Sequence, residues 1–323
     1  MLHGGIRTAL LSVLVAKVSA MVAVDSTKAV RVAVTQAEPE WLDLPATFKK
    51  TCRLIEEAAK NGAQLISFPE CWISGYPSWI WARSVDVDMT AIYNKNSLKA
   101  DSPEMQQICT AAKENSIAVC LGFAENYKQS LYIAQALIGA DGTILMQRRK
   151  LKATHMERTI FGEASASSLQ NVPLLKYHTY MQTEDVHIAA WPPVAPHTGG
   201  SDLWSMSGDG ARNLSRTYAI ESQSFVIHTT AVISQKSIDL MRTQTGVAMN
   251  TPGGGTSAVF GPDGRQLTAD LPEDEEGIIY ANLDMTSILH AKGFIDVCGH
   301  YSRHDLLWLG VDLRDKKPLR AEE

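Results

Sequence analysis

The chain has 323 residues, of which 45% are hydrophobic and 20% are charged, and its formal net charge is −5 at pH 7. This composition is ordinary for a globular protein without a membrane span, and the charge balance gives no reason to expect a nucleic acid or a membrane as partner. The five cysteines are scattered without a Cys-x-x-Cys pair, so they predict neither a disulfide framework nor a zinc site. A reducing, cytoplasmic location is the expectation.

The N-terminal segment differs in composition from the remainder. Residues 9–24 are mostly apolar and follow Arg7, which is typical of a secretory signal peptide. Lys17 interrupts this region, which is also shorter than the roughly 20 residues that a membrane span needs. Residues 1–28 are therefore a signal peptide, or else a loose leader or the product of a start codon chosen too early, with Met21 as the real beginning. Lys17 favours the second interpretation. Without an internal repeat or low-complexity linker, we expect residues 29–323 to form one domain.

The first third of the chain alternates apolar strands with amphipathic helices. Asp43 is a suitable N-cap for a helix that Gly62 ends, and Ser102 and Pro103 begin a second helix. The predicted apolar faces are Phe48, Cys52, Ile55 and Ala59 in the first helix, and Met105, Ile108, Cys109 and Ala112 in the second. The expected strands are residues 30–35, 63–68 and 117–123.

The same alternation continues to the C-terminus. The dipeptide Asp141-Gly142 between two apolar runs predicts a β-hairpin of residues 131–138 and 143–149. Further helices are expected at residues 173–183 and 213–223, and strands at 186–191, 225–230, 257–260, 265–268 and 277–283. Interleaved helices and strands predict a layered α/β fold in which helices cover sheets.

Two charged residues follow apolar strands and are candidates for chemistry. Glu70 ends the run FPE. It lies near four aromatic residues, Trp72, Tyr76, Trp79 and Trp81, where a partly dry pocket would raise its pKa toward that of a general base. Lys150 ends the run QRRK, where its ammonium could stabilise a developing anion. The alternatives are a surface glutamate in a proline-rich loop and a solvated basic run.

Other candidates are weaker on the residues alone. Glu157 could position Lys150 or a substrate, or it could pair with Arg158. His300 and His304 stand four apart, as metal ligands on a helix could, but without a third ligand they predict no metal site. We expect no cofactor.

Five runs, taken together, carry a resemblance to a known family. They are FPECWISGYPSWIW, RRKLKATHMERTIFGE, VHIAAWP, TPGGGTSAVFGPDG and GHYSRHDLLWLG. Their order resembles that of the nitrilase family of carbon–nitrogen hydrolases, closest to the fungal arylacetonitrilases, over residues 30–312. The resemblance implies an α-β-β-α sandwich, hydrolysis of a small-molecule nitrile to a carboxylic acid and ammonia, and assembly into dimers and often spiral filaments.

The resemblance also implies a Glu–Lys–Cys triad with an auxiliary glutamate. By position in these runs, Glu70 matches the general base, Lys150 the charge-stabilising lysine and Glu157 the auxiliary acid. Ala153 stands where such nitrilases usually carry proline.

The nucleophile of that triad is absent from its expected place. In the family, a strand, the cysteine and a Trp-Glu pair precede the stretch that begins here at Pro173. Here Val172 is joined directly to Pro173, and no cysteine occurs between Leu121 and Val297. One central strand and the nucleophile elbow are thus missing, which predicts that the chain as written is inactive.

No other cysteine is expected to substitute. Cys71 is adjacent to Glu70 and should point away from it, as neighbours along a strand do. Cys120 lies within an apolar strand and is interpreted as core. Cys298 lies in a segment that the family shares. Three interpretations remain: a nitrilase whose gene model lost a segment, a non-catalytic filament subunit, and an amidase or cyanide hydratase, which the motifs disfavour.

Overall fold

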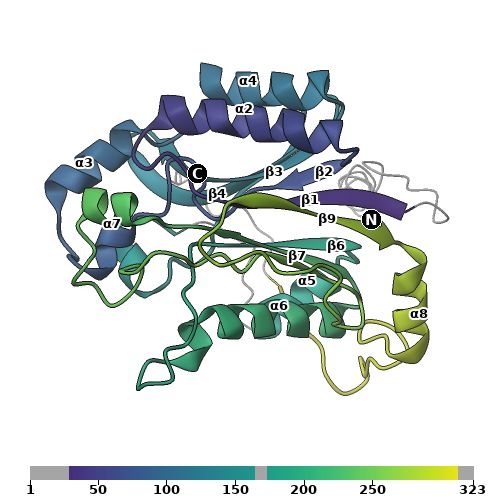
Figure 1. Cartoon of the computed structure of the whole chain (residues 1–323). Helices are drawn as coiled ribbons and strands as arrows, with labels where there is room; N and C mark the ends of the chain where they lie inside the picture. Colours follow the sequence, from purple (N-terminus) through teal and green to yellow (C-terminus); the bar gives the residue numbers. More distant parts are fainter. Residues whose placement is uncertain (1–28, 164–172, 312–323) are drawn as a thin grey trace, which may run out of the picture.

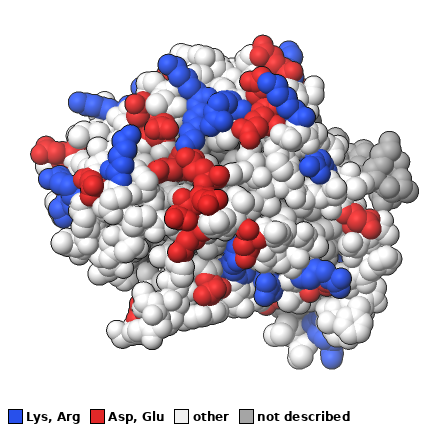
Figure 2. All heavy atoms as spheres, in the orientation of Figure 1, with Lys and Arg blue, Asp and Glu red and all other residues white. Residues whose placement is uncertain are grey.

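The computed structural model of the chain describes residues 29–163 and 173–311 (Figure 1). The expected leader, residues 1–28, and Val172 at the junction lie outside these ranges. Within them, no helix is long and apolar enough to cross a membrane. On the face shown in Figure 2, acidic and basic side chains are interspersed, so this face has no broad surface of one sign.

The strands of the described residues join into one nine-stranded sheet that branches at β1 and at β7. They are β1 (Ala29–Ala37), β2 (Leu65–Ser67), β3 (Ala118–Tyr127), β4 (Ser130–Ile138), β5 (Ile144–Arg149), β6 (Val186–Trp191), β7 (Phe225–Ala231), β8 (Ala258–Phe260) and β9 (Gly277–Asp284). The order is β5-β4-β3-β2-β1-β7-β6, with β8 on β7 and β9 antiparallel to β1. β1 pairs with β7 only at Gln36 and Ala37, so the sheet changes layer at that point.

Helices cover the strands from both sides. The α-helices are α2 (Leu44–Lys60), α3 (Val87–Lys95), α4 (Pro103–Glu114), α5 (Pro173–Tyr180), α6 (Gly208–Ser222), α7 (Gln235–Met241) and α8 (Thr286–Phe294). Short 3-10 helices are η2 (Ser78–Trp81), η3 (His155–Thr159) and η4 (Trp204–Met206). Figure 1 shows α2 and α4 on one side of the strands, and α5 and α6 on the other.

Alternating side chains show that two β layers lie between these helices. On β1, Ala33 belongs to the core under α2 and α4, whereas Val32 packs with Ile227 of β7. On β7, Val226, which directly precedes Ile227, faces the opposite way and packs with Tyr218 of α6. Because neighbouring residues of a strand point to opposite faces, this alternation defines the layers α-β-β-α. The expected sandwich is therefore present.

Most predicted elements are confirmed, with one rotated face. α4 buries all four expected residues, and β4 and β5 form the expected antiparallel hairpin. In α2, however, Thr47 and Thr51 are buried, whereas Phe48 and Cys52 are only partly buried. The Thr47 hydroxyl donates to the carbonyl of Glu40, and that of Thr51 to the carbonyl of Thr47. Two threonines can therefore occupy a face that polarity alone would place outside.

Other predicted boundaries are wrong. Residues 265–268 form no strand and make only an isolated bridge at Gln266. The helix expected at residues 213–223 begins at Gly208, because the hydroxyl of Ser207 caps its first turn. The helices α3, α7 and α8 and the 3-10 helices were not predicted, because these elements are short and of mixed polarity.

Candidate active site

Glu70 and Lys150 meet although 80 residues separate them. Glu70 follows β2 and Lys150 follows β5, and the strand order β5-β4-β3-β2 brings the ends of these strands to one region. The backbone N–H of Lys150 donates to the carbonyl of Ile133 (2.7 Å), and its Nζ lies 3.1 Å from Oε2 of Glu70. Their side chains are only 12% and 21% exposed, so neither is a surface residue.

Glu157 completes the charged cluster from η3. Its Oε2 lies 3.0 Å from Nζ of Lys150 and accepts the backbone N–H of Thr154 at 2.6 Å. Its Oε1 accepts the hydroxyl of Tyr76 at 3.1 Å. The alternative pairing with Arg158 is wrong, because the Arg158 guanidinium donates to the carbonyl of Ala153. The spacing of Thr154 and Glu157, which is that of a capping box, is the sequence signal that could have indicated this role.

One ammonium between two carboxylates leaves the cluster with excess negative charge. Burial raises the pKa of Glu70 to about 7; repulsion from Glu157 adds to this, and attraction by Lys150 opposes it. Burial alone would lower the pKa of Lys150, but the carboxylates of Glu70 and Glu157 outweigh it and raise that pKa above its usual value. Lys150 is thus held as a cation, while Glu70 can take up or release a proton near neutral pH.

The aromatic pocket expected around Glu70 is only partly present. Tyr76 contacts Glu157, and the indole N–H of Trp81 donates to the Tyr76 hydroxyl at 3.2 Å. Trp72 instead turns toward α2, where its N–H donates to Thr51 at 2.7 Å. Two of the predicted aromatic side chains, Tyr76 and Trp81, therefore connect to the charged cluster.

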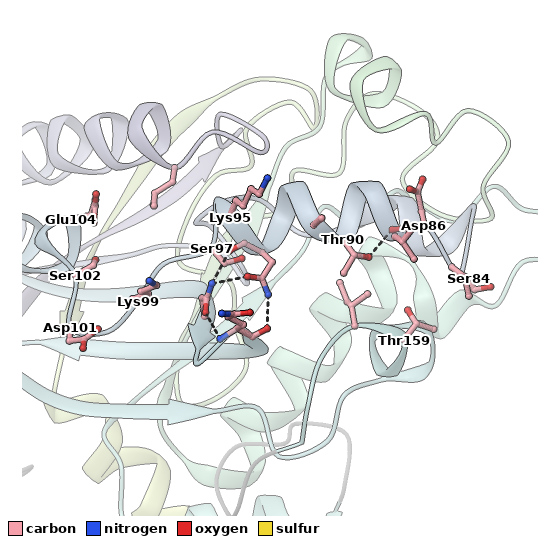
Figure 3. A pocket seen from close by; sticks show the side chains of 18 of the residues that line it. Ser84, Asp86, Thr90, Lys95, Ser97, Lys99, Asp101, Ser102, Glu104 and Thr159 are labelled. Atoms are coloured by element: carbon pink, nitrogen blue, oxygen red, sulfur yellow. Dashed lines mark hydrogen bonds between the residues drawn. The ribbon is translucent and has the colours of Figure 1, made fainter.

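A large surface hollow lies elsewhere. It encloses about 1360 Å³ between α3, the N-terminus of α4 and the β3–β4 turn (Figure 3). Its lining includes Asp86, Lys99 and Glu104, with Asn126 bonded to Asn94 across one wall. The charged cluster of Glu70, Lys150 and Glu157 does not line it, so this hollow is not the candidate active site.

Comparison with known proteins agrees with the geometry. Residues 31–292 match the family described as carbon-nitrogen hydrolase. The chain belongs to the carbon–nitrogen hydrolase family. An arylacetonitrilase of Aspergillus niger is 60% identical over 309 residues, covering 90% of this chain and 94% of that protein. An arylacetonitrilase of Hypocrea virens is 55% identical, covering 91% of this chain and 96% of its own length.

Solved structures of distant carbon–nitrogen hydrolases share the fold. One from Helicobacter pylori G27 superposes with a TM-score of 0.65 at 15% identity, over 83% of this chain and 94% of that one. An amidase of the nitrilase superfamily from Nesterenkonia AN1 gives a TM-score of 0.56 at 18% identity, over 82% of this chain and 94% of its own. At this identity, the likeness concerns architecture alone.

In this carbon–nitrogen hydrolase, Cys71 is fully buried and lies within electrostatic reach of the charged cluster. Its backbone is left-handed (φ 51°), so the alternation of a strand does not apply, and the expectation that it points away from Glu70 rested on a wrong premise. Burial and repulsion from Glu70 and Glu157, partly opposed by Lys150, raise the pKa of its thiol well above the usual value. The thiol stays protonated, which suits it poorly for attack.

The remaining cysteine and metal candidates lie apart from the cluster. Cys120 is buried in β3, as expected, and burial raises its pKa to about 12. Cys298 follows α8 and is half-buried. Across residues 29–163 and 173–311, no group of three or more His, Cys, Asp or Glu residues could hold a metal ion. His304 lies 3.5 Å from the Tyr177 hydroxyl, and His300 stacks edge-on against Tyr301.

Proposed function

We propose that the intact form of this hydrolase converts arylacetonitriles to carboxylic acids and ammonia. In this proposal Glu70 is the general base, Lys150 stabilises negative charge and Glu157 is the auxiliary acid. The observation that carries it is the buried ammonium of Lys150 between the two carboxylates, at 3.1 and 3.0 Å. The name arylacetonitrilase of relatives at 50–60% identity supports the substrate class.

The proposed reaction needs a thiolate in addition to these residues. A cysteine passes its proton to Glu70 and attacks the nitrile carbon, and Glu70 returns the proton to nitrogen, which leaves a thioimidate. Water adds to the thioimidate, ammonia departs, and a second water hydrolyses the resulting thioester to the acid. Lys150 faces the nitrogen or oxygen on which negative charge builds in each step, and a buried cation stabilises such charge more than one in water.

We infer that the chain as written lacks this nucleophile and does not turn over. The alignment with the Aspergillus niger relative runs over 309 residues but takes up only 90% of the 323 residues here. That relative therefore has residues in the aligned region that this chain lacks. The backbone carbonyl of Trp191 accepts the N–H of Glu70, and the indole Nε1 of Trp191 is buried without a hydrogen-bond partner among the described residues. A buried hydrogen-bond donor without a partner costs about 1–3 kcal/mol. This cost supports the inference that a segment which would pack there is missing.

The alternative is a non-catalytic subunit that joins dimers or filaments. The C-terminal part of the described chain exposes Leu289, Phe294, Leu306, Leu307 and Trp308 at 62–83%. Large apolar side chains that stay this exposed often lie at protein–protein contacts. We propose self-association through this segment for either form, with residues 29–323 as the hydrolase domain, residues 1–28 dispensable and the location cytoplasmic.

The experiment restores the missing segment. A family-type strand with its cysteine is inserted between Val172 and Pro173, and ammonia release from phenylacetonitrile is measured. We expect turnover that depends on Glu70 and Lys150. Equal turnover with Glu70→Gln or Lys150→Ala would refute the assigned roles. A transcript read across the junction separates the two forms: an intron that encodes the segment supports the nitrilase, and continuous exon sequence supports the non-catalytic subunit.

A further inference from the structure

Arg149, the residue before Lys150, is held by an ion pair and by two aromatic rings. Arg149, the last residue of β5, makes a two-pronged ion pair with Glu125 of β3, at 2.7 Å and 2.8 Å. Its guanidinium carbon also lies 3.9 Å from the ring centre of Tyr132 and 4.6 Å from that of Tyr127. Glu125 is only 2% exposed. A partly buried bidentate pair flanked by two rings is geometrically strict, because the planar guanidinium must satisfy all of these contacts at once.

Strand register explains why Arg149 reaches a residue two strands away. Glu125 of β3 stands opposite Tyr132 of β4, and Ala134 of β4 stands opposite Arg149 of β5. Tyr132 and Ala134 are two residues apart, so they share one face of the sheet. The Arg149 side chain therefore crosses diagonally over the Tyr132 ring to Glu125. One side chain thus ties together β3, β4 and β5 at the end where Lys150 begins.

The same tyrosine also touches the segment that follows η3. A Cβ placed on Gly162 would lie only 2.7 Å from the Tyr132 ring, so this position admits no side chain while the ring stays in place. The backbone N–H of Gly162 donates to the carbonyl of Leu131 at 2.9 Å. Tyr132 therefore has Arg149 over its ring face and Gly162 packed closely against its ring. The residues that follow Lys150 and Glu157 share this one support.

We propose that Arg149, held by Glu125 and Tyr132, is a positioning residue that fixes Lys150 between Glu70 and Glu157. Arg149 touches none of the three charged side chains of the cluster in the described structure, and it acts by fixing the backbone from which Lys150 projects. A lysine ammonium stands on a flexible four-carbon chain. The backbone must therefore be fixed for the ammonium to contact two carboxylates at once. This inference rests on the role proposed for Lys150.

The test follows the ionisation of Glu70 in the full chain and needs no turnover. Carboxyl ¹³C NMR of glutamate-labelled protein gives the midpoint of Glu70, and the spectrum of Glu70→Gln assigns its signal. The variants are Glu125→Gln and Arg149→Lys. When β5 loses its anchor, Lys150 moves away from Glu70, and loss of a nearby cation raises a carboxyl pKa. We expect the midpoint to rise by about one pH unit or more in both variants.

Direct charge effects predict a different result, which makes the test specific. Glu125→Gln removes a negative charge and by itself would lower the Glu70 midpoint, whereas Arg149→Lys leaves the charge unchanged. The matched control is Asp270→Asn, which breaks a second two-pronged arginine pair, Arg212 with Asp270 at 2.7 and 3.0 Å. The control should leave the midpoint in place, even where it lowers the melting temperature.

The outcomes are distinct from those of the nitrile assay. A midpoint that does not rise in the variants, or that rises as far in Asp270→Asn, overturns the positioning role. Arg149→Lys, which keeps a cation beside Glu125, decides the question alone if Glu125→Gln does not fold. A restored enzyme that fails to hydrolyse nitriles would overturn the proposed function and leave the titration result standing.

Discussion

The carbonyl oxygen of Trp191 accepts the backbone N–H of Glu70 at 3.3 Å. This bond joins the chain after β2 to the last residue of β6, which lies in the other β layer. Glu70 is therefore fixed from one layer by β2 and from the other by β6, while Lys150 and Glu157 approach from β5 and η3. The charged cluster lies where the carboxyl ends of parallel strands meet, a usual place for sites in α/β folds.

The raised pKa of Glu70 makes stability depend on pH. The folded state holds the Glu70 proton up to about pH 7, whereas the unfolded chain releases it near its ordinary value of 4.5. The stabilising contribution of Glu70 is thus fully present below about pH 4.5 and is lost as the pH rises through 7. Urea unfolding at pH 5 to 8 should show a fall in stability that is steeper in the wild type than in Glu70→Gln, by up to about 1.4 kcal/mol per pH unit. Parallel curves would show that Glu70 ionises normally.

Removing the ammonium of the cluster should be costly. Lys150→Met leaves two buried carboxylates facing each other, and breaking a buried pair in this way typically costs about 3–5 kcal/mol. The matched control is Lys152→Met, because Lys152 is 53% exposed and pairs with Glu163 at 2.9 Å on the surface. That change should cost less than about 1 kcal/mol. Urea unfolding at pH 8 measures both, and equal losses would mean that Lys150 is solvated in solution.

Local patterns predicted local structure well, and failures have identifiable causes. α4 and β6 match their predictions because apolar spacing and flanking caps agree there. The rotated face of α2 was missed because the two threonine hydroxyls donate to backbone carbonyls, that of Thr47 to Glu40 before the helix and that of Thr51 to Thr47 within it, which no hydrophobic pattern reports. Cys71 was misplaced because a single left-handed residue ended the strand alternation.

The residues of the site could be predicted, but the contacts between them could not. Glu70 and Lys150 stood out as charges at the ends of apolar strands, but their pairing across 80 residues came from the family resemblance. The bonds from Tyr76 to Glu157 and from Arg149 to Glu125 depend on strand register and loop path. Strand register is set by packing across strands, so it cannot be derived from the spacing of residues in a single sequence.

The two β layers share a hydrogen bond between hydroxyls near the site. Oγ of Ser67, at the end of β2, lies 2.7 Å from Oγ1 of Thr229 in β7, and both side chains are fully buried. Either single variant, Ser67→Ala or Thr229→Val, leaves the other hydroxyl buried without its partner. Each should lower the free energy of unfolding by about 1–3 kcal/mol. The double variant leaves no hydroxyl unpaired. Its loss of stability should therefore be smaller than the sum of the two single losses by about 1 kcal/mol. A double-mutant cycle by urea unfolding checks this, and strict additivity would show that the hydroxyls do not interact.

The chain as written should release no ammonia from phenylacetonitrile above background. A protonated, buried thiol is a poor nucleophile, and burial with the carboxylates of Glu70 and Glu157 keeps Cys71 in that form. Loss of a covalent nucleophile costs about 10⁴-fold or more in rate, so the deficit relative to the chain with the inserted segment should be at least that large. Cys71→Ala is the decisive companion variant, since it should leave both the background and the restored activity nearly unchanged. Turnover by the unmodified chain that Cys71→Ala abolishes would make Cys71 the nucleophile and overturn the inference of inactivity.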